Sequence, residues 1–409
     1  MSNKNENNMS DWGKANNSPL NLHKGVMNDF HLPKKVLLHD TTLRDGEQFP
    51  GVEFTVADKV AIGKALSDYG VHRIEIMPAV SKDDFEATKE LISLGLPSEI
   101  VGFCRSVESD VDKSVEAGCK SIVMEIITCP AVLKGVGWSF DEATDKFIRM
   151  SHYAKSKGLR VTAFFVAVTD APPEFSERFI KKILKEADID SIAIPDTFSK
   201  CLPNAIYHFV RDLKKWTDLP VEIHPHNAYN MGVANAISGV MAGAEVVHTC
   251  VNSLGEGAGN ATLDAVAVNL KMMLGIDTGV KFEKTYELSK LVSKLARVPI
   301  QANWPLVGDR VFTTESGILV DLITKMVEAG SALPPEHDIA TIVGRKRNIV
   351  VGKLSGSTSI KVKMKQLGLP EVDREKINQI LAVVKEQSTM KHDSLTDDEF
   401  KNIVSDLIK

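Results

Sequence analysis

The feature that most constrains the fold is a pattern repeated eight times between residues 36 and 275. Each repeat begins with a short apolar or β-branched run and continues with an amphipathic stretch of helical length, often ending in glycine. The repeat length of about 30 residues is that of one strand–helix unit. Eight such units predict an α/β fold in which eight parallel strands close into a (β/α)8 TIM barrel. The expected strands are 36–40, 72–77, 99–104, 121–126, 160–168, 191–196, 221–226 and 245–250.

A doubly wound open sheet would also alternate strands with helices. Such a sheet commonly carries G-x-G-x-x-G after its first strand, and no such motif follows residues 36–40. The closed barrel is therefore the preferred interpretation. It predicts that catalytic residues lie on the loops that follow the strands.

The chain divides into three predicted parts. Residues 1–30 are rich in Asn, Ser and Lys and predict a loosely ordered N-terminal arm. Residues 31–276 contain the eight repeats and form the predicted barrel. The alternation of strand-like and helix-like stretches ends there, and residues 277–409 predict a smaller, mostly helical C-terminal module.

Composition and charge exclude several classes of protein. The formal net charge is -5 and both signs are mixed along the chain, so neither nucleic acid nor a membrane surface is an expected partner. No apolar run reaches the length of a membrane span. The five cysteines are scattered and lack a C-x-x-C pair, which predicts free thiols and a cytoplasmic location.

The strongest local motif, HDTTLRDGEQFPG, occupies residues 39–51 directly after the first expected strand. It brings Arg44, Asp45 and Gln48 into one loop. A carboxylate there can ligate a hard cation, while a guanidinium can bind a carboxylate or enolate through paired hydrogen bonds. A surface salt-bridge loop turned by Gly46 is an equal alternative when this motif is taken alone.

A second motif, His224-Pro225-His226, closes the seventh expected strand. Residues i and i+2 of an extended chain project to the same face, so both imidazoles can reach one ion. Together with Asp45 they form a set of two histidines and one carboxylate, which is a normal set for a divalent metal with open positions.

A third motif, NSLGEGAGNATLD, follows the eighth expected strand at residues 252–264. Its glycines allow the loop to approach the barrel mouth closely, and Asn260 opens the last barrel helix, where anions can bind. The alternative is a plain left-handed turn with an Asn cap. Glu256 is the only carboxylate in the centre of this loop.

Other polar residues lie within or just after the expected strands. A carboxylate inside an apolar strand is costly unless it is paired, so Glu75 is expected to accept from Arg44. Glu125 can be either functional or a buried structural partner of a basic residue. Thr197 follows the sixth strand, and His248 is expected to be a core histidine with its hydrogen bonds satisfied.

Together, these motifs resemble the 2-isopropylmalate, homocitrate and citramalate synthases. These enzymes belong to a wider pyruvate-carboxyltransferase-like group that also contains hydroxymethylglutaryl-CoA lyase. The resemblance covers residues 35–275 strongly and continues weakly through FTTESGI and VVGKLSG. It is carried by LRDGEQ-x10-K at 43–59, IPDT at 194–197, HPHN followed by VAN at 224–235, and LGEGAGN at 254–260.

The resemblance implies roles for individual residues. Asp45, His224 and His226 resemble the ligands of a divalent ion (Mg, Mn or Zn), and Asn260 matches a position near or on that metal. Arg44 resembles the residue that stabilises the developing alkoxide. The positions matching the substrate shell are Gln48, Glu75 and Thr197, and Glu256 matches a glutamate near the acyl-CoA.

The chain also departs from the pattern of the family. Leu319 and Leu354 stand where the post-barrel motifs usually carry histidine, and the first of those histidines is credited with proton transfer. The proton-transfer group is therefore expected to come from the barrel, with Glu125, Glu256 or His248 as candidates.

The implied reaction is a Claisen-type condensation of acetyl-CoA with a 2-oxo acid, typical of amino-acid biosynthesis. The resemblance also implies a homodimer in which residues 277–409 cover the neighbour's active site. Two alternatives remain: a metal-dependent carbon–carbon lyase of the hydroxymethylglutaryl-CoA lyase type, and a catalytically altered relative that only binds a ligand. The lyases use a cysteine in the loop after strand eight, whereas Cys250 sits at the strand end, and the LGEGAGN loop favours a synthase. The missing histidines motivate the second alternative, and the complete set of Arg44, Asp45, His224 and His226 argues against it.

Overall fold

Residues 18–331 and 338–408 are described by the computed structural model, and they fall into two compact units, residues 1–300 and 301–409. The predicted N-terminal arm lies outside the described residues up to residue 17. Its remainder contains a short 3-10 helix, η1 (Pro19–Leu22), and the short helix α2 (Lys24–Met27). The chain then joins the first unit, where the Tyr207 hydroxyl donates to the Asp29 carbonyl over 2.7 Å.

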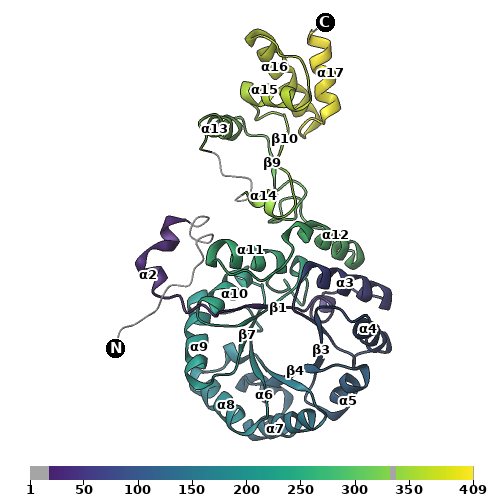
Figure 1. The fold of residues 1–409 in the computed structure, drawn as a ribbon, viewed down its shortest axis with the longest axis vertical. Coiled ribbons are helices and arrows are strands. Elements are labelled where there is room, and N and C mark those ends of the chain that lie inside the picture. The colour runs from purple at the N-terminus through teal and green to yellow at the C-terminus, as the bar shows by residue number, and fades with distance from the viewer. Residues whose placement is uncertain (1–17, 332–337, 409) are drawn as a thin grey trace. The chain divides into compact units, whose positions relative to one another are not determined.

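The first unit is a closed barrel of eight parallel strands in sequential order, which confirms the predicted fold (Figure 1). β1 pairs with both β2 and β8, so the sheet has no free edge. The strands are β1 (Leu37–Asp40), β2 (Arg73–Ile76), β3 (Glu99–Cys104), β4 (Ser121–Ile127), β5 (Arg160–Val166), β6 (Ser191–Asp196), β7 (Val221–Pro225) and β8 (Val246–Thr249).

Helices surround the barrel, and capping residues in the local sequence mark where they begin and end. Thr55 and Asp58 form a capping box that opens α3, and Gly70 ends that helix with a φ of 107°. Ser139 and Glu142 cap α7 in the same way. The surrounding helices are α3 (Val56–Tyr69), α4 (Lys82–Ser93), α5 (Glu108–Ala117), α6 (Pro130–Val136), α7 (Phe140–Ser156), α8 (Pro173–Glu186), α9 (Pro203–Trp216), α10 (Gly232–Met241) and α11 (Leu263–Leu274).

Side chains alternate between the two faces of each strand, and the two faces have different chemistry. Outward residues such as Leu38, Ile74 and Ile122 join the large apolar core shared with the helices. Inward residues of β3 to β6 form a small apolar cluster (Val101, Phe103, Val123, Phe164 and Ala193). The inward positions of β1, β2, β7 and β8 are instead polar and buried: His39, Glu75, Glu222, His224 and His248.

The first unit extends beyond the predicted barrel boundary at residue 276. The helix α12 (Thr285–Ala296), preceded by η5 (Phe282–Lys284), packs against α3. The Asn252 side chain donates to the Ser289 carbonyl over 2.9 Å, which ties α12 to the loop after β8. The compact unit therefore ends at Ile300, because α12 covers the barrel rather than opening the next module.

The second unit is mostly helical, with one parallel two-stranded sheet formed by β9 (Thr313–Thr314) and β10 (Asn348–Ile349). Its own apolar core includes Val351, Ile360, Ile380 and Phe400. Its helices are α13 (Gly317–Glu328), α14 (Ile339–Ile342), α15 (Ser357–Gln366), α16 (Arg374–Lys391) and α17 (Asp397–Ile408).

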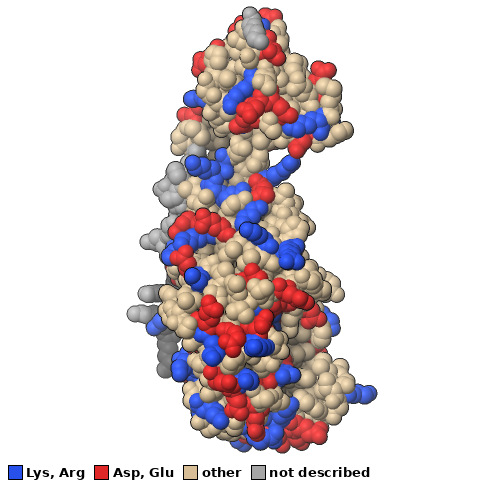
Figure 2. Space-filling view, turned by 90° about the vertical axis from the view of Figure 1, so that its right-hand side faces the viewer, with Lys and Arg blue, Asp and Glu red and all other residues tan. Residues whose placement is uncertain are grey.

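Surface charge and cysteine chemistry agree with the composition. Acidic and basic side chains intermingle on the face drawn in Figure 2, without a continuous basic area. All five cysteines lie within the described residues and are free thiols. Among the described helices, none has the length and apolar character needed to cross a membrane.

Candidate functional site

The loop after β1 is anchored on both sides before it reaches the barrel mouth. Thr42 Oγ1 accepts from the Val251 amide over 2.9 Å, which links this loop to the loop after β8. On the other side, buried Lys59 forms ion pairs with Glu47 and Asp84. These anchors fix the backbone that carries Arg44 and Asp45, so both side chains project from a rigid segment.

Asp45, His224 and His226 come together at the mouth of the barrel. Their candidate ligand atoms all lie within 4.8 Å of one another. Asn260 joins them, because its Nδ2 donates to Asp45 Oδ1 over 3.0 Å and its backbone pairs with His226. The four residues predicted to hold a metal therefore lie together, contributed by the ends of β1 and β7 and the loop after β8.

Two buried polar atoms in this group lack a hydrogen-bond partner. His224 Nε2 lies 3.3 Å from Asp45 Oδ2 without forming an aligned hydrogen bond, and Asn260 Oδ1 has no donor. Leaving such atoms unpaired in a protein interior costs about 1–3 kcal/mol each. An imidazole nitrogen and an amide oxygen beside a carboxylate are a suitable donor set for a divalent cation. These residues therefore fit a metal ion.

Electrostatics favour the protonation states that bind metals. Burial lowers the pKa of His224 to about 3 and also lowers that of His226, so both imidazoles are neutral near pH 7. Burial alone would raise the pKa of Asp45, but Arg44 and the two histidines hold it well below its ordinary value. The group thus offers two neutral imidazoles and one carboxylate.

Arg44 is held in place by two carboxylates and an aromatic ring. Its Nε donates to Glu75 Oε1 over 2.5 Å, and its Nη1 donates to Asp45 Oδ2 over 2.7 Å. The guanidinium carbon lies 4.2 Å from the centre of the Phe103 ring. Nη2 has no partner, so this Arg keeps one buried donor for an anionic oxygen beside the candidate metal ligands.

The pairing of Glu75 with Arg44, expected from the sequence, is present. Glu75 is fully buried, and its second oxygen lies 3.1 Å from Nε2 of His39. Glu75 therefore orients the guanidinium and has little room to contact a substrate directly.

The other predicted site residues come from β4 and from the loops after β1, β6 and β8. Gln48 is exposed and lines a cavity of about 720 Å³ together with Arg44. Thr197 accepts from the Ala167 amide over 3.0 Å. Glu256 is exposed at the tip of its loop. Glu125 is partly buried and lines a separate cavity of about 380 Å³ with Arg105, Trp138 and Lys146.

The glycines after β8 allow this loop to approach the candidate ligands. A Cβ added at Gly255, whose φ is 135°, would lie 2.3 Å from Asn260 Nδ2 and 2.9 Å from Asp45 Oδ1. A Cβ at Gly259 would lie 1.6 Å from the Ser253 carbonyl oxygen. Only glycine fits these positions, whereas a Cβ at Gly257 would meet no atom within 4 Å.

Three residues next to this centre, two of them buried and Arg73 half-buried, were not singled out as functional from the sequence. His39, Glu222 and Arg73 connect the candidate ligands to the barrel interior. Glu222 stands two residues before His224, so the period of two along the strand contained a signal for it. His39 and Arg73 lie on different strands, and their proximity depends on the closed barrel.

Comparison with known proteins identifies the family. Residues 35–292 match the HMGL-like family model. The chain belongs to the HMGL-like family. Residues 306–392 match a second model, the homocitrate synthase post-HMGL domain-like domain. The family resemblance predicted from the motifs is therefore confirmed.

Several curated relatives of this HMGL-like chain are synthases. A 2-isopropylmalate synthase of Methanocaldococcus jannaschii is 35% identical over 94% of this chain and 74% of its own length. An (R)-citramalate synthase of the same organism is 36% identical over 86% of this chain and 70% of its length. A 2-isopropylmalate synthase of Sulfolobus acidocaldarius is 37% identical over 86% of this chain and 90% of its own length.

Solved structures share the fold. HMG-CoA lyase from Bacillus subtilis has a TM-score of 0.60 at 20% identity and covers 66% of this chain and 96% of its own. At this identity the likeness supports the barrel architecture alone.

Proposed function

We propose that this chain is a metal-dependent acyltransferase that condenses acetyl-CoA with a 2-oxo acid. The synthase relatives and the post-HMGL domain support this reaction class over the lyase alternative. The single observation that carries the metal-dependent chemistry is the set of unpartnered atoms at the barrel mouth. His224 Nε2, Asn260 Oδ1 and Arg44 Nη2 are all buried there without hydrogen bonds.

The proposed roles of the site residues follow from the positions of these unpartnered atoms. Asp45, His224, His226 and Asn260 would hold a divalent ion, with Mg, Mn and Zn as the candidates. When bound, such an ion supplies Lewis-acid polarisation of a substrate carbonyl. Arg44 Nη2 donates to the oxygen on which negative charge develops during carbon–carbon bond formation. Glu75 and Phe103 keep the guanidinium in place, so little reorganisation is needed as the charge develops.

We assign the proton-abstracting role to Glu125 in preference to Glu256. Burial raises the pKa of Glu125, which makes this carboxylate a stronger base near neutral pH. It also lines a cavity with Lys146, which can bind an anionic group, whereas Arg105 in the same cavity is paired with Asp110. Glu256 is exposed, although it lies close enough to His226 for its charge to oppose the lowering of the His226 pKa by burial.

The matched test of this assignment is Glu125→Gln against Glu256→Gln. Glu125→Gln should lower kcat by roughly 10²-fold or more, as loss of a general base typically does. Glu256→Gln should leave kcat near the parental value. Equal activity of Glu125→Gln and the parent would require another base.

The partner proposal retains the homodimer. The helix α13 presents an apolar stripe to solvent within its own unit, with Ile318 86%, Leu322 52% and Val327 60% exposed. A stripe of this kind is typical of a protein–protein contact, and a second copy of this chain is the proposed occupant. Leu354 and Leu319 are also exposed, which makes this surface apolar where the family usually carries histidine.

The test of this interface is Leu322→Asp, with Leu94→Asp as its control. Leu94 is 43% exposed at the C-terminal end of α4, which precedes β3 and therefore lies at the end of the barrel opposite its mouth. Light scattering after gel filtration should give a dimer for the parent and the control and a monomer for Leu322→Asp. A monomeric parent would contradict the homodimer.

The reaction itself is tested by release of free thiol from acetyl-CoA with a panel of 2-oxo acids. A parallel assay measures cleavage of 3-hydroxyacyl-CoA substrates. We expect thiol release that depends on a 2-oxo acid and on added divalent metal. Cleavage without condensation would favour the lyase. Ligand binding without either reaction would favour a catalytically altered relative.

A further inference from the structure

Glu222 occupies the inward position of β7 two residues before His224, and it is fully buried. Arg73 Nη1 donates to its Oε1 over 2.9 Å, and the Ser191 hydroxyl donates to the same oxygen over 2.8 Å. Its other oxygen, Oε2, lies 2.7 Å from Nε2 of His248. The carboxylate is therefore fixed from three strands.

The contacts of His248 define where its proton lies. Glu222 forms an ion pair with Arg73 and accepts from the Ser191 hydroxyl, so this carboxylate is ionised and can only accept hydrogen bonds. Nε2 of His248 must then carry the proton that it donates to Glu222. In a neutral imidazole the second nitrogen, Nδ1, is left as an acceptor.

That acceptor faces a candidate metal ligand. Nδ1 of His248 lies 3.2 Å from Nδ1 of His224. Two ring nitrogens at this distance form a hydrogen bond only if one of them carries a proton, and His248 Nδ1 does not. His224 therefore donates from Nδ1, which leaves its Nε2 with a free lone pair on the side of Asp45.

We propose that His248 and Glu222 are positioning residues that hold His224 in the tautomer presenting Nε2 to the metal ion. This inference rests on the proposed function, because it requires a metal at Asp45, His224 and His226. Histidine ligands generally donate their other N–H to a carboxylate, carbonyl or water, which fixes the ring and its tautomer. Here His248 is the acceptor for the His224 N–H, and the Glu222 carboxylate in turn orients His248.

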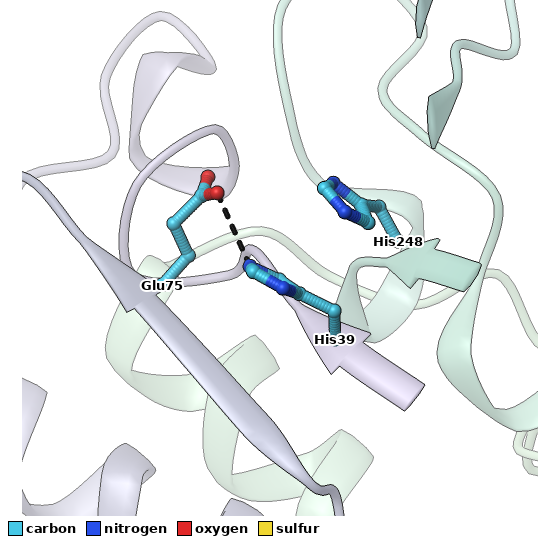
Figure 3. Close-up of side chains that lie close together, drawn as sticks. All are labelled: His39, Glu75 and His248. Atoms are coloured by element: carbon cyan, nitrogen blue, oxygen red, sulfur yellow. Dashed lines mark hydrogen bonds and ion pairs between the residues drawn. The ribbon is translucent and has the colours of Figure 1, made fainter. Parts of the chain in front are cut away.

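The same residues could be interpreted as a second metal site, since ligand atoms of His39, Glu75 and His248 lie within 4.8 Å of one another. The polar atoms of Glu75 and His248 are already engaged with protein partners, and His39 keeps one buried nitrogen, Nδ1, without a partner. Figure 3 shows Glu75 joined to His39, with His248 drawn without a bond to either. Both oxygens of Glu75 face donors, on Arg44 and His39, and both nitrogens of His248 face Glu222 and His224.

The experiment measures affinity of the metal-free full-length protein for Mn²⁺ and Zn²⁺ by competition with a chromophoric chelator. His248→Phe keeps a ring of similar size but removes the acceptor for His224, so affinity should fall by about 10- to 100-fold. His248→Gln can donate to Glu222 and accept from His224, and should restore most of the affinity. The control is His39→Gln, equally buried and stacked on His248 but not in contact with His224; it should bind as the parent does.

A second measurement requires no variant of His248 and no metal. Solid-state ¹⁵N spectra of the metal-free parent, with His224 assigned from its loss in His224→Gln, report which ring nitrogen is protonated. A protonated Nδ1 supports the proposal, and a protonated Nε2 overturns it. Equal affinity of His248→Phe and the parent also overturns it. A parent that binds no divalent ion contradicts the proposed function, whereas the ¹⁵N result still decides the tautomer.

Discussion

Two clusters of histidines and carboxylates occupy neighbouring parts of one barrel. They differ in which of their buried polar atoms lack a hydrogen-bond partner. In the cluster of Asp45, His224 and His226, a buried nitrogen lacks a partner, and so does the neighbouring Asn260 oxygen. In the cluster of His39, Glu75 and His248, both oxygens of Glu75 and both nitrogens of His248 contact protein partners, and within these three side chains Nδ1 of His39 is the buried atom that lacks one.

The comparison shows that spacing alone does not make a metal site. Both clusters place three suitable side chains within the same distance limit. Arg44 donates to the carboxylate of each cluster, so its charge does not distinguish them. In the first cluster an unpartnered imidazole nitrogen lies near an unpartnered amide oxygen, whereas in the second both oxygens of Glu75 and both nitrogens of His248 face protein partners. We therefore expect the first cluster to bind one ion per chain and the second to orient its neighbours.

The largest expected effect comes from removing ligands of the first cluster. The double variant Asp45→Ala/His224→Ala should lose bound metal, and thiol release should fall to background, as it should after chelation of the parent. Metal analysis after gel filtration and the thiol assay provide the two readouts. Full metal occupancy in the double variant would contradict the assignment of this cluster as the metal site. Two bound ions per parental chain would show that both clusters bind metal.

Arg44 links the two clusters, and its effect should come next in size. Arg44→Lys keeps the charge but cannot donate to Glu75, Asp45 and a substrate oxygen in the same planar arrangement. We expect kcat to fall by roughly 10²- to 10³-fold, as for loss of one oxyanion donor. Steady-state kinetics separate the alternatives: an unchanged kcat with a raised KM would show that Arg44 only binds substrate.

His39 gives the second cluster a pH dependence of its own. Burial lowers its pKa to about 4, below the ordinary 6.5, so the folded protein keeps it neutral while the unfolded chain binds a proton between these values. Its contribution to stability is therefore complete above pH 6.5 and is lost as the pH falls toward 4. The loss should be about 3 kcal/mol at most.

The corresponding measurement compares thermal unfolding of the parent and His39→Gln at pH 7.5 and pH 5. Glutamine retains a donor for Glu75 and cannot be protonated in this range. The parent should lose more stability on acidification than the variant. Parallel pH profiles would show that His39 does not titrate with folding.

The smallest effect is expected for Glu75→Gln. Glutamine can still accept from Arg44, but it lacks the charge that draws the guanidinium into place. We expect a decrease in kcat of about 10-fold, the lower end of the range for residues that orient ligands, with metal affinity unchanged. A loss of metal affinity as large as that of His224→Ala would assign Glu75 to the metal and merge the two clusters.

The sequence allowed the barrel and the metal-binding candidates to be predicted because both depend on local patterns. The strand–helix repeat identifies the barrel, and barrel geometry brings the ends of β1 and β7 and the loop after β8 to one mouth. The pairing of Arg44 with Glu75 was also accessible, since a buried carboxylate needs a partner.

Features that depend on contacts between strands were harder to predict. His248 was expected to be a satisfied core histidine, and it is buried with partners at both nitrogens. Its link from Glu222 to His224 depends on which residues of β7 and β8 lie side by side, which no local pattern encodes. The end of the first unit was missed for a similar reason: the helical pattern of α12 does not reveal that the helix packs against α3.

The loop after β8 has a consequence for the evolution of new activities. Gly255 and Gly259 tolerate no side chain, and Gly257, although unobstructed, has a φ of 63°, which favours glycine. Residues 256 and 258 are exposed, so a combinatorial library that varies these two would sample the barrel mouth while keeping the candidate metal ligands in place. Libraries that include Gly255 would mostly recover inactive clones, because a new side chain there displaces Asn260 and Asp45. Selection for a changed substrate range therefore has two codons to work with in this loop.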